Sequence, residues 1–152
     1  MQSKNWPSVL LLSAGLCGMS AAGTADPVAD ALALFHDYEA RSTRFDPTLA
    51  DLYSDNAVIR SKRLDLRGGV RELSFSGSKW KLMIRAAMPI AKMRGDTNRF
   101  DELSARAAGD AVIITAKRHS ELKGYTSPFR LVVRRDGSGS WKIVEEDTET
   151  QP

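Results

Sequence analysis

The sequence predicts an α+β domain in which helices come first and an antiparallel sheet follows. Apolar residues recur at helical spacing in three segments before residue 95, and the period changes to two from residue 98 onward. Glycine-containing turns separate the later apolar runs, as in consecutive β-hairpins. The chain has 152 residues, of which 42% are hydrophobic and 27% charged. This length and composition are typical of one soluble globular domain.

Residues 1–25 have the three-part pattern of a secretory signal peptide. Lys4 supplies a positive start, an apolar run over residues 9–19 follows, and small residues end the segment. Cleavage is expected near Ala22 or Ala25, which predicts an exported protein, periplasmic or secreted. The run is too short to cross about 30 Å of hydrocarbon, so we expect no membrane span.

The rare residue types exclude several kinds of site. Cys17 is the one cysteine and lies in the expected signal peptide, so residues 26–152 contain neither a disulfide nor a thiol nucleophile. His36 and His119 are far apart and lack metal-ligand spacing, so we expect no metal and no other cofactor. The net charge of +3 excludes a strongly basic nucleic-acid arm.

Three helical segments are predicted. The first follows Asp26 and has an apolar stripe over residues 28–38. The second starts at Asp46-Pro47, where a capping carboxylate precedes a proline at the first helical position. The third is expected to be capped by Ser78 and to end at Gly95. Its apolar stripe comprises Trp80, Met83, Ile84, Ala87, Met88 and Ala91.

The strands form a hairpin and a meander in this prediction. The hairpin precedes the third helix and turns at Gly68-Gly69. Four further strands follow that helix and are connected by short turns. The expected strands are residues 57–66 and 70–76 for the hairpin, then about 98–108, 111–120, 126–135 and 140–148.

Two segments carry a resemblance to a known family. Phe35 to Ile59 contains Asp46-Pro47-Thr48-Leu49 and Leu52-Tyr53-Ser54-Asp55-Asn56-Ala57-Val58, and it resembles the opening of nuclear transport factor 2-like domains. Gly139-Ser140-Trp141-Lys142-Ile143-Val144 is similar to their end. The superfamily includes SnoaL-type polyketide cyclases, ketosteroid isomerases and scytalone dehydratase. The resemblance implies a cystatin-like cone, in which a curved sheet wraps on helices, and often a homodimer.

Turn geometry predicts which side chains face the helices. A two-residue turn with glycine first at Gly109-Asp110 pairs Ala108 with Ala111. This register places His119 on the outer face, opposite Phe100, and therefore at the surface or a dimer interface.

The last hairpin is predicted in the same way. A five-residue connection pairs Arg135 with Trp141. Phe129 then lies on the inner face, and the outer face pairs Arg130 with Glu146.

This register places four charged residues on the inner face at one end of the sheet, namely Asp101, Arg118, Glu145 and Asp147. An apolar interior with a charged mouth is typical of a ligand pocket. The alternative is that these side chains are simply solvated beyond the core. The expected pocket residues are Tyr38, Tyr53, Trp80, Met83, Leu103, Ile114, Phe129 and Leu131, and the helix residues among them can equally be core.

Residues 60–94 contain ten basic and two acidic side chains. The basic residues of the hairpin are Arg60, Lys62, Arg63, Arg67 and Arg71. This surface suits contact with an anionic envelope surface or with an acidic face of a second chain. It lacks interleaved aromatic residues, so nucleic acid is not an expected partner.

Three hypotheses about function follow. The first is an exported module that binds a small apolar or anionic ligand, or serves in assembly, without catalysis. The second is an acid–base isomerase or dehydratase acting on a small cyclic or carbonyl compound. In it, Asp101, Glu145 or Asp147 is the base, and Arg118 stabilises developing negative charge. The third is a protein-interaction domain that uses the basic hairpin.

Overall fold

The computed structural model describes residues 26–152, so the expected signal peptide lies outside the described residues. The predicted α+β class is confirmed, with two α-helices, one 3₁₀ helix and six strands within the described range. The elements are α1 (Pro27–Thr43), η1 (Pro47–Leu52, the 3₁₀ helix), β1 (Tyr53–Leu64), β2 (Val70–Ser76), α2 (Gly77–Arg94), β3 (Asn98–Ala108), β4 (Ala111–Ser120), β5 (Tyr125–Arg135) and β6 (Trp141–Thr150).

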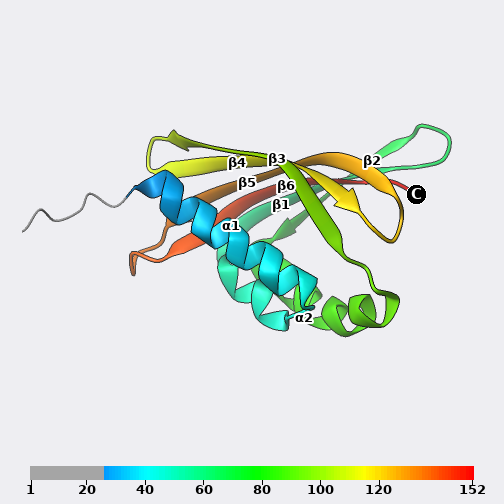
Figure 1. Cartoon of the computed structure of the whole chain (residues 1–152), viewed down its shortest axis with the longest axis horizontal. Coiled ribbons are helices and arrows are strands. Elements are labelled where there is room, and N and C mark those ends of the chain that lie inside the picture. The colour runs from blue at the N-terminus through cyan, green and yellow to red at the C-terminus, as the bar shows by residue number, and fades with distance from the viewer. Residues whose placement is uncertain (1–25) are drawn as a thin grey trace, which may run out of the picture.

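The six strands form one curved, open sheet in the order β2-β1-β6-β5-β4-β3. Neighbouring strands are antiparallel except β1 and β6, which pair in parallel. The sheet is therefore mixed. The β1–β2 hairpin joins the four-stranded meander along β6, and β1 and β6 run parallel. Figure 1 shows the helices on one face of the sheet. We call this the inner face and the opposite one the outer face.

The helices begin largely where their capping residues predict. Asp26 caps α1 and Asp46 caps η1, each by accepting a hydrogen bond from a backbone amide. Ser76 caps α2, so the prediction of Ser78 is wrong by two residues. The Ser78 hydroxyl instead donates to the carbonyl oxygen of Asp55, which ties α2 to β1. Within residues 26–152, no helix combines the length and apolar character needed to cross a membrane.

A β-bulge changes the inner face of β3. The predicted pairing of Ala108 with Ala111 is confirmed, but the register shifts between Asp101 and Ser104. Glu102 has a left-handed backbone conformation at this bulge, with a φ of 53°. Beyond the bulge Phe100 pairs with Arg118, not with His119 as predicted. Traced from the Gly109-Asp110 turn toward the start of β3, the side chains beyond the bulge change faces. Phe100 therefore points to the inner face.

A second bulge has the same effect on β6. Arg135 pairs with Trp141 as predicted, and Val133 pairs with Ile143. The register then shifts, so that Leu131 pairs with Glu146 and Arg130 pairs with Asp147. The predicted pairing of Arg130 with Glu146 is therefore wrong. Val144 is the additional residue, and it turns Glu146 toward the helices.

Aromatic side chains fill the centre of the inner face. The Phe100 ring centroid lies 5.4 Å from that of Phe35 and 5.0 Å from that of Phe129. Tyr38 packs on the same group, 5.8 Å from Phe129. Aromatic pairs at these separations add to the stability gained by burying their area. The bulge in β3 is therefore matched to the core, because without it Phe100 would point to solvent.

Gly77, the first residue of α2, allows a close approach to the chain around the start of β1. A Cβ atom there would lie 1.9 Å from the carbonyl oxygen of Ser54 and 2.8 Å from the amide nitrogen of Ala57. We predict that Gly77→Ala lowers the free energy of unfolding by about 2 kcal/mol, because backbone atoms cannot move aside as side chains do. Denaturant unfolding measures this change.

Gly137→Ala is the matched control. A Cβ atom at Gly137 meets no heavy atom within 4 Å, and its φ is not in the left-handed region. Its free energy of unfolding should stay the same or rise slightly, since alanine reduces the entropy of the unfolded chain. Equal stabilities for the two variants would contradict the close approach at Gly77.

Candidate functional site

A cavity that is open to solvent lies between the helices and the start of β3, with a volume of about 340 Å³. Four of the predicted pocket residues line it: Tyr38 from α1, Tyr53 from β1, and Trp80 and Met83 from α2. The other lining residues are Ser42, Phe45, Leu49, Ile84, Ala87, Met88, Ala91, Asp96 and Asn98. The apolar stripe of α2 thus forms one wall of the cavity.

The other four predicted pocket residues do not line this cavity. Ile114 and Leu131 are fully buried in the core, and Phe129 is also buried there but lines a different cavity, formed by β1, β2, β4, β5 and β6. Leu103 is 36% exposed because it lies at the bulge in β3. These four residues therefore do not belong to the cavity beside α2.

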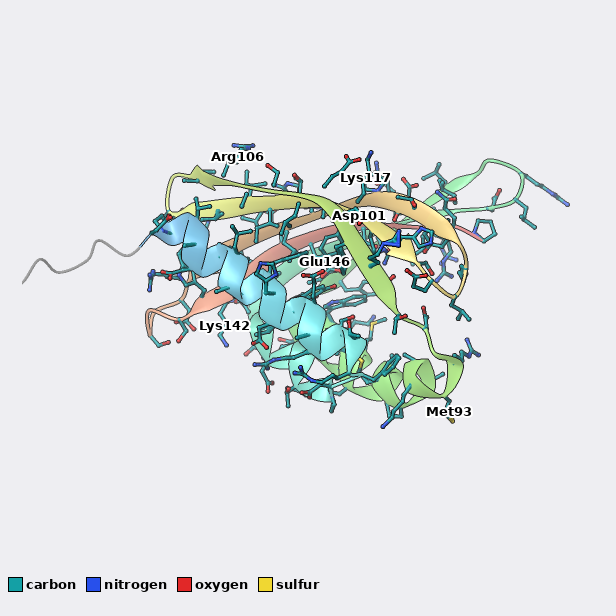
Figure 2. The ribbon with its side chains drawn as sticks, in the orientation of Figure 1. Met93, Asp101, Arg106, Lys117, Lys142 and Glu146 are labelled. Atoms are coloured by element: carbon teal, nitrogen blue, oxygen red, sulfur yellow. The ribbon has the colours of Figure 1, made fainter. Side chains whose placement is uncertain are left out.

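A buried carboxyl group lies behind one wall of the cavity. Glu146 is only 3% exposed, and the hydroxyl of Tyr53, itself 2% exposed, donates a hydrogen bond to Glu146 Oε2. Figure 2 shows Glu146 between the sheet and the helices, whereas Arg106 and Lys117 project from the outer face. Tyr53 lines the cavity and Glu146 does not, so the tyrosine separates the carboxyl group from the cavity.

Burial raises the pKa of Glu146 to about 7. The hydrogen bond from Tyr53 and the positive charge of Arg118 oppose this shift, and the charge of Asp147 adds to it. Burial also raises the pKa of Tyr53 well above its ordinary value, and the nearby Glu146 carboxylate raises it further. Tyr53 is therefore a neutral donor at neutral pH, and Glu146 is a mixture of acid and carboxylate.

Two more polar groups reach the cavity wall. Burial raises the pKa of Tyr38 above its ordinary value, so its hydroxyl stays neutral. The indole nitrogen of Trp80 is buried and has no hydrogen-bond partner among the described residues. The same indole is close enough to the Tyr53 hydroxyl to lower the pKa of Tyr53. The Trp80 N–H therefore lies near the Tyr53 hydroxyl without forming a hydrogen bond of ordinary geometry.

Arg118 lies on the inner face, as predicted. Its Nη2 donates to the Tyr125 hydroxyl at 3.1 Å and to the carbonyl oxygen of Glu149 at 2.5 Å. Its charge acts on Glu146 by lowering the pKa of that carboxyl group. Of the four charged residues predicted for the inner face, Arg118 is the one that the structure places there.

The inner-face placement of Asp101, Glu145 and Asp147 is wrong. Asp101 is exposed and pairs with Arg99 at 3.2 Å, because the bulge in β3 turns it outward. In β6 the bulge at Val144 turns Glu145 and Asp147 to the outer face in the same way. Both carboxylates contact Arg60 and Arg130, at distances between 2.7 and 3.3 Å.

Glu146 is the residue that the sequence analysis missed. The sequence offers three successive acidic residues, Glu145-Glu146-Asp147, on a strand in which alternate side chains face alternate sides. The face of each depends on whether the strand contains a bulge before it. The sequence does show that Glu146 is the middle residue of the three. Its side chain must therefore lie on the opposite face of the sheet from Glu145 and Asp147.

The histidines do not form a site with these groups. His119 lies on the outer face as predicted, with its Nδ1 2.9 Å from Thr126 Oγ1, and it pairs with Arg99. His36 is exposed on α1, 3.3 Å from Glu39. Within residues 26–152, no three His, Cys, Asp or Glu side chains are arranged to hold a metal ion.

The basic residues of the β1–β2 hairpin differ in whether they form ion pairs. Arg60 forms the ion pairs with Glu145 and Asp147, and Lys62 lies 3.8 Å from Glu72. Arg63, Arg67 and Arg71 are exposed. All five basic side chains of the hairpin are exposed, and two of them also form ion pairs within the domain.

No protein-family model matches the sequence, and no curated protein matches it. A solved protein of unknown function from Pseudomonas putida KT2440, of the NTF2-like group, is 18% identical over 79% of this chain and 83% of its own, with a TM-score of 0.59. The chain has the nuclear transport factor 2-like fold. The predicted resemblance is thereby confirmed at the level of the fold.

Other solved NTF2-like proteins are similar to a comparable extent. A provisionally named dehydratase from Streptomyces avermitilis is 17% identical over 80% of this chain and 94% of its own, with a TM-score of 0.57. A provisionally named ketosteroid isomerase from Shewanella frigidimarina is 21% identical over 82% of this chain and 96% of its own, with a TM-score of 0.52. At these identities the NTF2-like fold is shared, and the function must be argued from the site.

The raised pKa of Glu146 predicts a specific dependence of stability on pH. The pKa is about 7 in the folded state against an ordinary value of 4.5, so the folded state binds this proton more tightly. The resulting stability is present below pH 4.5 and is lost as the pH rises to about 7. Glu146→Gln does not undergo this loss. The difference in free energy of unfolding between the variant and wild type should therefore be about 3 kcal/mol more in favour of the variant at pH 8 than at pH 4.

Glu145→Gln is the matched control, since Glu145 is the exposed neighbour on the same strand. Glu145→Gln should lack the change of about 3 kcal/mol expected for Glu146→Gln, because Glu145 is not buried. Denaturant unfolding at four or five pH values gives both curves. If the two variants show the same pH dependence, Glu146 is not the buried titrating group.

Proposed function

We propose that the domain binds a small, largely apolar molecule with a hydroxyl or carbonyl group in the cavity between α2, η1 and β3. The observation that carries this proposal is a cavity with mostly apolar walls and a tyrosine backed by a buried carboxyl group. A volume of about 340 Å³ is at the lower end of the range for small-molecule sites. It suits a ligand of one or two rings.

The unused hydrogen-bonding capacity favours a hydroxyl group on the ligand. The Tyr53 hydrogen is donated to Glu146, so the Tyr53 oxygen is left as an acceptor toward the cavity. The buried N–H of Trp80 lies close to this oxygen and forms no hydrogen bond of ordinary geometry among the described residues. A ligand hydroxyl can donate to Tyr53 and accept from Trp80, whereas a carbonyl oxygen can only accept.

The position of Glu146 favours binding without catalysis over acid–base catalysis. A general base must reach the proton that it removes, directly or through one water. Tyr53 lies between Glu146 and the cavity, so the carboxyl group acts on a ligand through the tyrosine. In this role Glu146 orients the Tyr53 hydroxyl and makes its oxygen a better acceptor.

Acid–base catalysis is the second candidate. The pKa of about 7 for Glu146 favours it, since a carboxyl group at that value can both take and give a proton near neutral pH. Two NTF2-like neighbours bear the provisional names of a dehydratase and a ketosteroid isomerase. In this candidate Glu146 replaces Asp101, Glu145 and Asp147 as the base, and Tyr53 passes the proton.

The binding proposal is tested with 1-tetralol, a bicyclic alcohol, and with tetralin, the hydrocarbon of the same shape. Each is titrated into ¹⁵N-labelled protein while the indole N–H signal of Trp80 is followed by NMR. We expect a saturable shift with 1-tetralol and an affinity for tetralin at least threefold weaker, because tetralin cannot satisfy Trp80 or Tyr53. Absence of a saturable shift with both compounds would contradict the proposal.

Adjacent alanines of α2 supply matched variants. Ala87 lines the cavity and Ala86, which is exposed, does not. Ala87→Phe fills part of the volume and should weaken 1-tetralol binding at least tenfold, whereas Ala86→Phe should leave it unchanged. Equal affinities in the two variants would place the bound alcohol elsewhere on the domain.

A further inference from the structure

A second and larger hollow lies at one end of the sheet, with a volume of about 800 Å³. Four segments form it: the turn after β1, the start of β3, the β4–β5 turn and the residues after β6. Figure 1 shows the β1–β2 and β4–β5 hairpins and the C-terminus gathered at this end. We call it the end cleft. Its lining residues include Arg63, Leu64, Leu66, Arg67, Arg118, Lys123 and Tyr125.

Positive charge predominates in the end cleft. Its four cations are Arg63, Arg67, Arg118 and Lys123. The opposing charges are Asp65 and Asp96. One oxygen of Asp65 accepts from the amides of Arg67 and Gly69, each at 2.8 Å, so this carboxylate serves to close the turn. None of the four cations forms a salt bridge with another residue of the described range.

Arg118 is the fixed cation of this group. It is half-buried, and its Nη2 is anchored by three neutral oxygens, from Tyr125, Ser127 and the backbone of Glu149. Its Nε is buried and has no hydrogen-bond partner among the described residues. A partly buried guanidinium that forms no salt bridge and lacks a full set of acceptors is stabilised when an anion joins it.

We propose that the end cleft binds an oxyanion, a carboxylate or phosphate group, through the guanidinium of Arg118. The planar fork of arginine matches the two oxygens of such groups, and its hydrogen bonds to them are about twice as strong as those to neutral acceptors. Arg67 and Lys123 reinforce the charge from the two turns. Leu64, Leu66 and Tyr125 provide apolar contacts for the organic part of the ligand. The proposal does not rest on the proposed function, although Asp96 and Asn98 line both cavities and the charge of Arg118 also acts on the pKa of Glu146.

The test uses two probes, sodium phosphate and sodium hexanoate, at ionic strength held constant with sodium chloride. The Nε–H signal of Arg118 is followed by NMR in ¹⁵N-labelled protein. We expect a saturable shift with at least one probe, and the comparison of the two identifies whether the group preferred is phosphate or carboxylate. Chloride alone should give no saturable shift. Absence of saturation with both probes would overturn the proposal.

Variants distinguish the end cleft from general attraction of anions. Arg118→Gln should weaken binding of the effective probe at least tenfold, and Arg67→Gln, at an exposed turn, at least threefold. Arg106→Gln is the matched control, because Arg106 projects from the outer face near the other end of the sheet and carries the same charge. Circular dichroism checks that each variant is folded. An equal loss of binding in Arg106→Gln would show that net charge, and not the cleft, attracts the anion.

Should Arg118→Gln fail to fold, Arg67→Gln decides the question, since Arg67 lies in an exposed turn. Weaker binding in Arg67→Gln than in Arg106→Gln supports the end cleft. Equal binding in these two variants contradicts it.

Discussion

One extra residue in β6 determines the character of this domain's interior. Val144 forms a bulge, so Glu146 turns toward the helices, and Glu145 and Asp147 turn to solvent. Burying a carboxyl group is costly unless it is neutral or hydrogen-bonded. Glu146 meets both conditions in part, through a pKa of about 7 and the hydrogen bond from Tyr53. The buried carboxyl group behind Tyr53 is there because of this bulge.

The same bulge organises the outer face. With Glu145 and Asp147 turned outward, their carboxylates lie beside Arg60 on β1 and Arg130 on β5. Exposed ion pairs stabilise a fold only slightly, but a network of four charges across three strands favours one register over a slipped one. A one-residue slip of β6 would bury two carboxylates and expose a third. The strand therefore has one register that suits both faces.

Much of the fold could be predicted from local signals. Gly109-Asp110 fixed the first turn of the meander, the stripe from Trp80 to Ala91 identified the cavity wall on α2, and Asp46-Pro47 marked the start of η1. The inner-face acids could not be predicted, because a bulge leaves no distinctive residue in this sequence. Glu102 adopts a φ of 53° although it is not a glycine, and Val144 resembles any other strand residue. What selects both bulges is long-range packing, such as that of Phe100 against Phe35 and Phe129.

The most direct test of this account is a ¹³C NMR titration of the side-chain carboxyl carbons, with the Glu146 signal assigned by its absence in Glu146→Gln. The account predicts that this one carboxyl group titrates with a midpoint near pH 7. A midpoint for Glu146 at the ordinary glutamate value of 4.5 would contradict the account, because the carboxyl group would then be solvated and the bulge at Val144 would not turn it inward.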